Sequence, residues 1–218
     1  MPKNILVIAP HCLDEILGCA GTVAKHIAAG DTVNTAILFG DGQHQDAARR
    51  QNAIAASKIL GANEPIFLGF AENRSDTIAL LDVVSRLEKL LNQIKPEAVY
   101  INHGGNLNID HQTTYKAGVT ALRPAPGCPT KAIYSYETLS STDWAPPNPG
   151  NSFQPTYFID ISRSLEQKEL ALKQYIGDVK PSPHSRSLES LFAQATVRGH
   201  SVGLKAAEAF MVLRQIQD

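Results

Sequence analysis

Short apolar runs alternate with longer segments of helical periodicity along the first half of the chain. The run at 5–9 is apolar at every position, which is typical of a strand buried on both faces, and segment 15–29 carries apolar residues at helical spacing. Strands and helices that alternate in this way predict a Rossmann-like α/β fold, a doubly wound, mostly parallel sheet with helices on both faces. The later strands are expected at 31–39, 65–69 and 98–102, and the later helices at 45–60, 77–94 and 112–122.

The pattern becomes less regular after residue 123. Strand-like alternation recurs at 131–139 and 157–161, and a helix is expected from Ser162 to about Tyr175. The rest of the carboxyl-terminal region, including the alanine-rich segment 206–210, is expected to be helical.

Proline-rich stretches at 124–127 and 144–150 lie between these elements. We interpret them as loops that shape a substrate site, because neither reads as a linker to a second domain. A length of 218 residues with 43% hydrophobic content suits one domain with a sizeable core. We therefore expect residues 1–218 to fold as a single domain.

Charge and cysteine content narrow the class of protein. A net charge of −1 gives no long-range field that would favour nucleic acid or an acidic membrane. Three cysteines, an odd number, argue against a disulfide framework and fit a reducing compartment. No apolar run approaches the roughly 20 residues that cross a bilayer, and the first residues do not resemble a secretory signal. We expect a cytoplasmic protein without a transmembrane segment, and the sequence leaves homo-oligomerisation open.

Polar side chains stand where the first and fourth predicted strands end. His11 and Asp14 occupy the turn after 5–9, and His111 follows 98–102. Taken alone, the first turn is better explained by acids that favour a helix amino terminus and by a histidine that is only a polar turn residue. Because the carboxyl ends of parallel strands meet at one sheet edge, however, the three side chains can converge. Two imidazoles and a carboxylate are the ligands of a catalytic Zn²⁺, although another divalent metal would also suit them.

These residues resemble the motifs of the LmbE/PIG-L family of zinc-dependent N-acyl deacetylases. The family's first motif is typically Ala-His-Pro-Asp-Asp-Glu, and residues 10–15 here read Pro-His-Cys-Leu-Asp-Glu. A later family motif ends in Asp-His, as do residues 108–111. The resemblance covers most of the chain. It implies zinc on His11, Asp14 and His111, and a hydrolase that removes an N-acetyl group from an amino sugar, a glycoconjugate or a related small amide.

Two departures from the family pattern concern the mechanism. Leu13 occupies the position of the family's general base, and Asn108 stands where many members carry a histidine. His184, in a loop directly after Pro181 and Pro183, is our best candidate for proton transfer, and Glu137 is a weaker one. The alternative is a metal- and sugar-binding pseudoenzyme that lacks the base. A nucleotide-binding protein is less well supported, because no Walker sequence or Gly-x-Gly-x-x-Gly fingerprint occurs.

Further residues are assigned by the same resemblance. Asp110 is expected to orient His111 through a hydrogen bond. Arg50, in preference to Arg49, is expected to bind phosphate or sugar hydroxyls with its planar guanidinium. Asp41 and Asn108 are expected to lie near the substrate.

Overall fold

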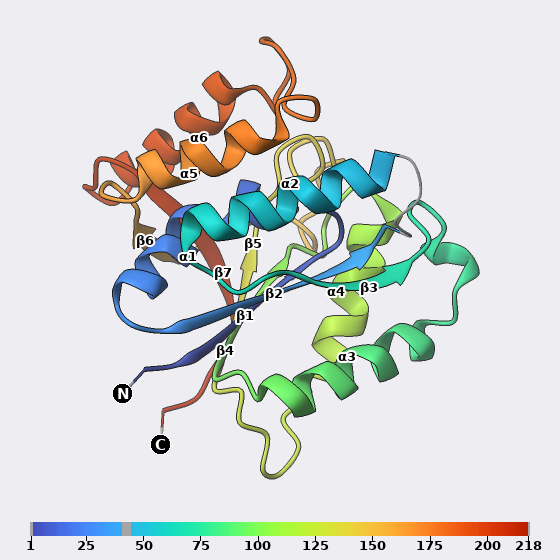
Figure 1. The fold of residues 1–218 in the computed structure, drawn as a ribbon. Coiled ribbons are helices and arrows are strands. Elements are labelled where there is room, and N and C mark those ends of the chain that lie inside the picture. Colours follow the sequence, from blue (N-terminus) through green and yellow to red (C-terminus); the bar gives the residue numbers. More distant parts are fainter. Residues whose placement is uncertain (1, 41–44, 218) are drawn as a thin grey trace.

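The structure is a computed structural model that describes residues 2–40 and 45–217. Strand β1 (Asn4–Ala9) lies inside its central sheet (Figure 1). The sheet has seven strands in the order β3-β2-β1-β4-β5-β7-β6. β1 to β5 pair in parallel, and β7 pairs antiparallel with β5 and β6. The other strands are β2 (Thr32–Phe39), β3 (Ile66–Phe70), β4 (Ala98–Asn102), β5 (Ala132–Tyr136), β6 (Tyr157–Asp160) and β7 (Ala207–Gln215).

Helices cover both faces of this sheet, which confirms the doubly wound α/β fold (Figure 1). One face carries α1, α2, α5 and α6, whose apolar side chains pack in one core with Ile5, Val7 and Ala9 of β1. The opposite face is covered by α3 and α4. The helices are α1 (Asp14–Ala28), α2 (Gln45–Leu60), α3 (Leu80–Ile94), α4 (Ile109–Ala121), α5 (Leu165–Leu172) and α6 (Leu188–His200), with short 3₁₀ turns at Ser75–Thr77 and Lys173–Tyr175.

Close packing of α1 against the sheet depends on Gly18. A Cβ atom at this position would lie 2.2 Å from the ring of Tyr136 on β5. The Tyr136 hydroxyl donates a hydrogen bond of 2.9 Å to the carbonyl of Ile8 on β1. Glycine therefore brings α1 against the strands from whose ends the functional residues emerge.

The carboxyl-terminal end of the chain differs from the sequence prediction. Residues 207–215 form strand β7, whereas we expected helix across this region beyond α6. Phe210 pairs with Tyr136 on β5 and with Tyr157 on β6, and its side chain is completely buried. Two neighbouring strands thus supply pairing and burial that outweigh the helical preference of the alanines.

Strands β1 and β4 mark the position at which the chain switches from one face of the sheet to the other. The helix after β1 covers one face, and the helix after β4 covers the opposite face. The turns at the carboxyl ends of β1 and β4 therefore border a crevice, the usual ligand site of an open α/β sheet. No helix within the described ranges combines the length and apolar character needed to span a membrane.

Candidate metal and substrate site

The turn between β1 and α1 brings His11 and Asp14 together. The backbone N–H of His11 donates to Asp14 Oδ2 at 3.1 Å, and the backbone N–H of Asp14 donates to the His11 carbonyl at 3.3 Å. Leu13, which precedes the helix, has a φ of 88°. This left-handed backbone conformation is unusual for leucine, and it turns the chain sharply enough for the reciprocal bonds to form.

A second turn, between β4 and α4, positions His111. The Asn108 side chain caps α4 by accepting a 2.8 Å hydrogen bond from the backbone N–H of Asp110. At the end of β4, the Asn102 side chain donates to the His111 carbonyl at 2.8 Å. His111 therefore lies in the first turn of α4, directly beside the β1 turn.

The side chains of His11, Asp14 and His111 converge. One potential ligand atom from each lies within 4.8 Å of the others, and no other group of this kind occurs among residues 2–40 and 45–217. Asp14 Oδ2 is 3.1 Å from His111 Nε2 and 3.4 Å from His11 Nδ1. Two imidazoles and a carboxylate at these separations match the ligands that Zn²⁺ takes in catalytic sites.

The pKa values of this cluster fit a cation site. Burial favours the neutral form of Asp14, but His111 and His11 outweigh it and hold the pKa of Asp14 well below its usual range. Burial lowers the pKa of His11, yet hydrogen bonds with Asp110 and Asp14 raise that pKa to about 9. A proton on His11 thus balances buried negative charge, and a divalent cation could replace that proton.

Asp110 contacts a different histidine from the one we expected. It is fully buried, and its Oδ2 lies 2.8 Å from His11 Nε2 rather than beside His111. The backbone N–H groups of Asn73 and Ser75 donate to the same carboxylate at 2.6 and 3.3 Å. Asp110 therefore lies beside the cluster as we expected, but the ring that it contacts is that of His11 and not that of His111.

A cavity of about 130 Å³ opens onto the cluster. Arg49 lines it and forms ion pairs with Asp178 at 3.0 Å and Glu72 at 3.4 Å. The lining residues are His11, Cys12, Leu13, Asp14, Arg49, Glu72, Asn73, Asn108, His111, Ser141, Asp178 and Arg186.

Arg50, which we preferred to Arg49, does not line this cavity, but it lines a small neighbouring pocket that also includes His11. Its guanidinium stacks on the Phe67 ring, 4.8 Å from the centroid, and donates to the Gly40 carbonyl. Asn108 does line the cavity and also donates to Asn73 at 3.2 Å. Asp41 lies outside the described residues.

Neither candidate for proton transfer lines the cavity. Glu137 uses both carboxylate oxygens in hydrogen bonds of 2.7 Å from Arg198, so this carboxylate already has a partner outside the cavity. His184 Nδ1 accepts a 2.9 Å hydrogen bond from the backbone N–H of Arg186, and its ring lies 5.2 Å from that of Trp144. The geometry of His184 is that of a residue that shapes its loop, whereas Arg186 reaches the cavity.

Sequence reasoning missed Glu72, Asp178 and Arg186. Glu72 follows β3 closely, and its position after a parallel strand is a signal that could have identified it. Asp178 and Arg186 come from the segment between α5 and α6. Nothing in the local sequence indicates that this segment crosses to the ends of β1 and β4.

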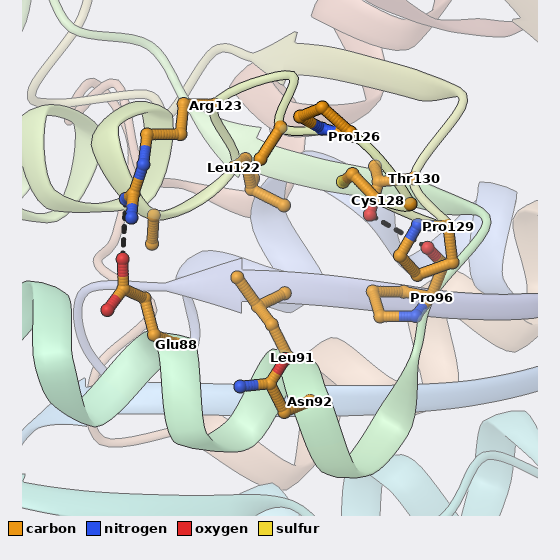
Figure 2. Close-up of a pocket in the computed structure, with 13 residues that line it drawn as sticks. Glu88, Leu91, Asn92, Pro96, Leu122, Arg123, Pro126, Cys128, Pro129 and Thr130 are labelled. Carbon is orange, nitrogen blue, oxygen red and sulfur yellow. Dashed lines mark hydrogen bonds and ion pairs between the residues drawn. The ribbon is translucent and has the colours of Figure 1, made fainter.

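A larger cavity, of about 330 Å³, lies at the opposite edge of the sheet (Figure 2). It is bordered by α3, the end of α4 and the loop that leads into β5, with the Glu88–Arg123 ion pair at one side. Thr130 donates to the Pro96 carbonyl at 2.8 Å, so this hydroxyl already has a partner. The residues that line this cavity include no histidine, and Glu88 is their single carboxylate, so they do not form a metal site like that of His11, Asp14 and His111.

Comparisons with known proteins indicate the family and the fold of this chain. The family model "PIG-L: GlcNAc-PI de-N-acetylase" matches residues 6–122. The "Uncharacterized deacetylase YaiS" of Escherichia coli (strain K12) is 31% identical over 176 residues, 78% of this chain and 88% of that protein. The 4-oxalmesaconate hydratase of Pseudomonas putida is 25% identical over 209 residues, 80% of this chain and 74% of that protein. N,N'-diacetylchitobiose deacetylase from Pyrococcus horikoshii has a similar fold, with a TM-score of 0.77, 20% identity and coverage of 97% and 84% of the two chains.

Proposed function

Because the chain belongs to the PIG-L family, we propose that it is a metal-dependent hydrolase that removes the acetyl group from an N-acetylated amino sugar or a related small amide. The observation that carries this proposal is the convergence of His11, Asp14 and His111 beside a cavity. These three side chains would hold Zn²⁺ or a similar divalent ion. Such an ion polarises the amide carbonyl and lowers the pKa of a bound water to about 7.

The group that accepts the proton of the attacking water must come from another residue, since Leu13 has no acceptor. Apart from Asp14, the carboxylates that line the cavity in the described part of the chain are Glu72 and Asp178. We assign the role to Glu72, whose negative charge lies close enough to His11 to raise the pKa of that imidazole. Asp178 is held more closely by Arg49, at 3.0 Å, than Glu72 is, at 3.4 Å.

Arg49 and Asn108 complete the proposed machinery. Arg49 holds the carboxylates of Glu72 and Asp178 on the cavity wall through its ion pairs. Glu72 takes a proton from a water molecule beside the acetamide and returns it to the leaving amine. Asn108, which lines the cavity, offers its side chain to the substrate.

The test is release of free amine from a panel of N-acetylated amino sugars. Zinc-loaded wild type should turn over at least one of them, and a chelator should abolish the reaction. Glu72→Gln should lower kcat by about 10²- to 10⁴-fold, the usual contribution of a general base, while Asp76→Asn in the exposed turn nearby leaves it unchanged. Binding of metal and sugar without turnover would mean a pseudoenzyme, and equal loss in both variants would remove Glu72 from this role.

Hydration of a carbon–carbon double bond is the second candidate. The similarity to 4-oxalmesaconate hydratase favours it, since that protein is named as a hydratase and its match covers 80% of this chain. Loss of ultraviolet absorbance from a conjugated unsaturated dicarboxylate would reveal the activity. Such a loss without amine release from any amide would replace the deacetylase proposal.

A further inference from the structure

Arg186 lies on the wall of the cavity, and its guanidinium has no partner among the residues that the structure describes. Its side chain is half-buried, and its Nε–H is enclosed without an acceptor. Within residues 2–40 and 45–217, Arg186 forms neither an ion pair nor a side-chain hydrogen bond. It lines the same cavity as His11, Asp14 and His111.

The other arginines near this side of the sheet are engaged. Arg49 pairs with Asp178 and Glu72, Arg50 bonds to Gly40 and stacks on Phe67, and Arg198 is paired through two hydrogen bonds with Glu137. These contacts compensate the desolvation of each guanidinium. Arg186 differs because no group in the described part of the chain compensates its burial, which is costly for an unpaired charge.

The backbone around Arg186 is fixed. Its N–H donates to His184 Nδ1 at 2.9 Å, and its carbonyl accepts from the backbone N–H of Lys180 at 3.3 Å. The next residue, Ser187, caps α6 by accepting from the backbone N–H of Ser190 at 3.2 Å. The loop thus holds Arg186 at the cavity, and the ordering of its backbone does not have to be supplied by a ligand.

We propose that Arg186 binds an anionic group on the substrate, so that the preferred substrate is an acidic N-acylated sugar bearing a carboxylate or a phosphate. The planar guanidinium matches either group through paired, charge-assisted hydrogen bonds. The acetamide then lies toward His11, Asp14 and His111, and the anion lies toward the loop before α6. This inference rests on the proposed function, because it names the substrate class for the same cavity.

Unreactive ligands provide a test that does not depend on turnover. Muramic acid is glucosamine with a lactyl ether on O3, which adds a carboxylate, and glucosamine 6-phosphate carries a phosphate on O6 instead. Calorimetry on the full-length, zinc-loaded protein should show at least one acidic ligand binding about tenfold more tightly than glucosamine, as a charge-assisted pair predicts. The acidic ligand that binds more tightly identifies the anion as carboxylate or phosphate.

Arg186→Gln should reduce this preference to near unity, while the dissociation constant of glucosamine stays within about twofold. Arg163→Gln, which removes the same charge at an exposed position outside the cavity, should keep the wild-type preference. Arg186→Lys, which keeps the charge without the planar fork, should retain part of it. Equal thermal unfolding midpoints for all variants would show that the comparison concerns folded proteins.

Two outcomes would overturn the inference: no preference for acidic ligands in wild type, or an unchanged preference in Arg186→Gln. Amine release from N-acetylated sugars is measured separately. A preference that depends on Arg186, without hydrolysis of any amide, would contradict the proposed function and leave anion recognition standing. Hydrolysis of neutral and acidic amides at equal rates, with equal binding, would contradict the inference about Arg186 and leave the proposed function standing.

Discussion

Asp110 Oδ2 lies 2.8 Å from His11 Nε2, although the two residues are 99 positions apart in the sequence. The buried carboxylate has no donor of its own when ionised, so the proton of this bond belongs to the imidazole. His11 therefore presents Nδ1 toward Asp14, at 3.4 Å. A carboxylate behind a metal-binding histidine fixes the orientation and the tautomer of the ring.

Replacement of Asp110 should weaken metal binding rather than abolish it. In Asp110→Ala, His11 loses the bond that orients its ring, and zinc affinity should fall about 10- to 100-fold, as for other groups that support metal ligands. Competition against a chromogenic chelator measures the change. Asp76→Ala, at an exposed position in the neighbouring 3₁₀ turn, is the matched control. Unchanged affinity in Asp110→Ala would contradict the assigned role.

Metal binding should release a proton near neutral pH. The metal-free His11 has a pKa raised to about 9, because its contacts with Asp110 and Asp14 outweigh burial. The imidazole is thus protonated at pH 7 and must lose this proton before Nδ1 can bind a cation. Zinc affinity should rise with pH, by about tenfold per unit between roughly pH 6 and 8, and then level off above the pKa of His11.

Calorimetry in buffers of different ionisation enthalpy counts the released protons directly. About one proton per zinc at pH 7 is the expected contribution of His11. Binding without proton release, and with no dependence on pH, would show that His11 is neutral before the metal arrives or does not bind it.

Leu13 offers a test by gain of function. Its φ of 88° is a conformation that aspartate adopts more readily than leucine, and the residue lines the cavity. An aspartate at this position would present a second proton acceptor to the same water. Leu13→Asp should therefore restore amine release to the Glu72→Gln variant by about tenfold or more, whereas Leu13→Asn, which cannot accept the proton, should not. Equal rates in the two double variants would argue against a base at either position.

The buried Lys168–Glu208 pair should be important for stability. Lys168 Nζ lies 2.7 Å from Glu208 and donates to the Leu17 carbonyl at 2.9 Å, while Glu208 accepts from the backbone N–H groups of Gly21 and Thr22. Lys168→Met would leave the Glu208 charge buried without its partner, at a cost of about 3–5 kcal/mol in the free energy of unfolding. Urea denaturation measures it, with Lys173→Met in an exposed ion pair as control.

A smaller loss would contradict this view of the pair. In Lys168→Met/Glu208→Gln the charge is removed from both residues, and the loss should be less than that of Lys168→Met alone. Because the pair joins α5 and β7 to the middle of α1, these variants should alter stability more than zinc affinity.

The sequence predicted β1 to β4 because each strand-like segment there is followed by a segment of helical character, and it predicted β5 from strand-like alternation. It failed at β7, where alanines favour helix locally and only the pairing of Phe210 with Tyr136 and Tyr157 decides for a strand. Pairing of this kind involves residues far apart in the chain, so it cannot be predicted from the local periodicity of 207–215.

The same distinction holds for the site. His11, Asp14 and His111 could be predicted because each follows a parallel strand at a known edge of the sheet. The contact of Asp110 with His11, rather than with its neighbour His111, depends on which way the first turn of α4 faces. Arg186 reaches the cavity from a loop near the carboxyl terminus, and its importance depends on the absence of a partner within the described residues, which sequence cannot reveal.

The central claim is that His11, Asp14 and His111 hold a metal on which amide hydrolysis depends. The most direct test titrates zinc into metal-depleted protein and measures bound zinc and amine release together, in wild type and in His111→Ala. We predict one tightly bound zinc per chain, with activity that rises in proportion to it, and loss of both in His111→Ala. Activity that does not follow bound zinc, or stoichiometric zinc retained in His111→Ala, would contradict the account.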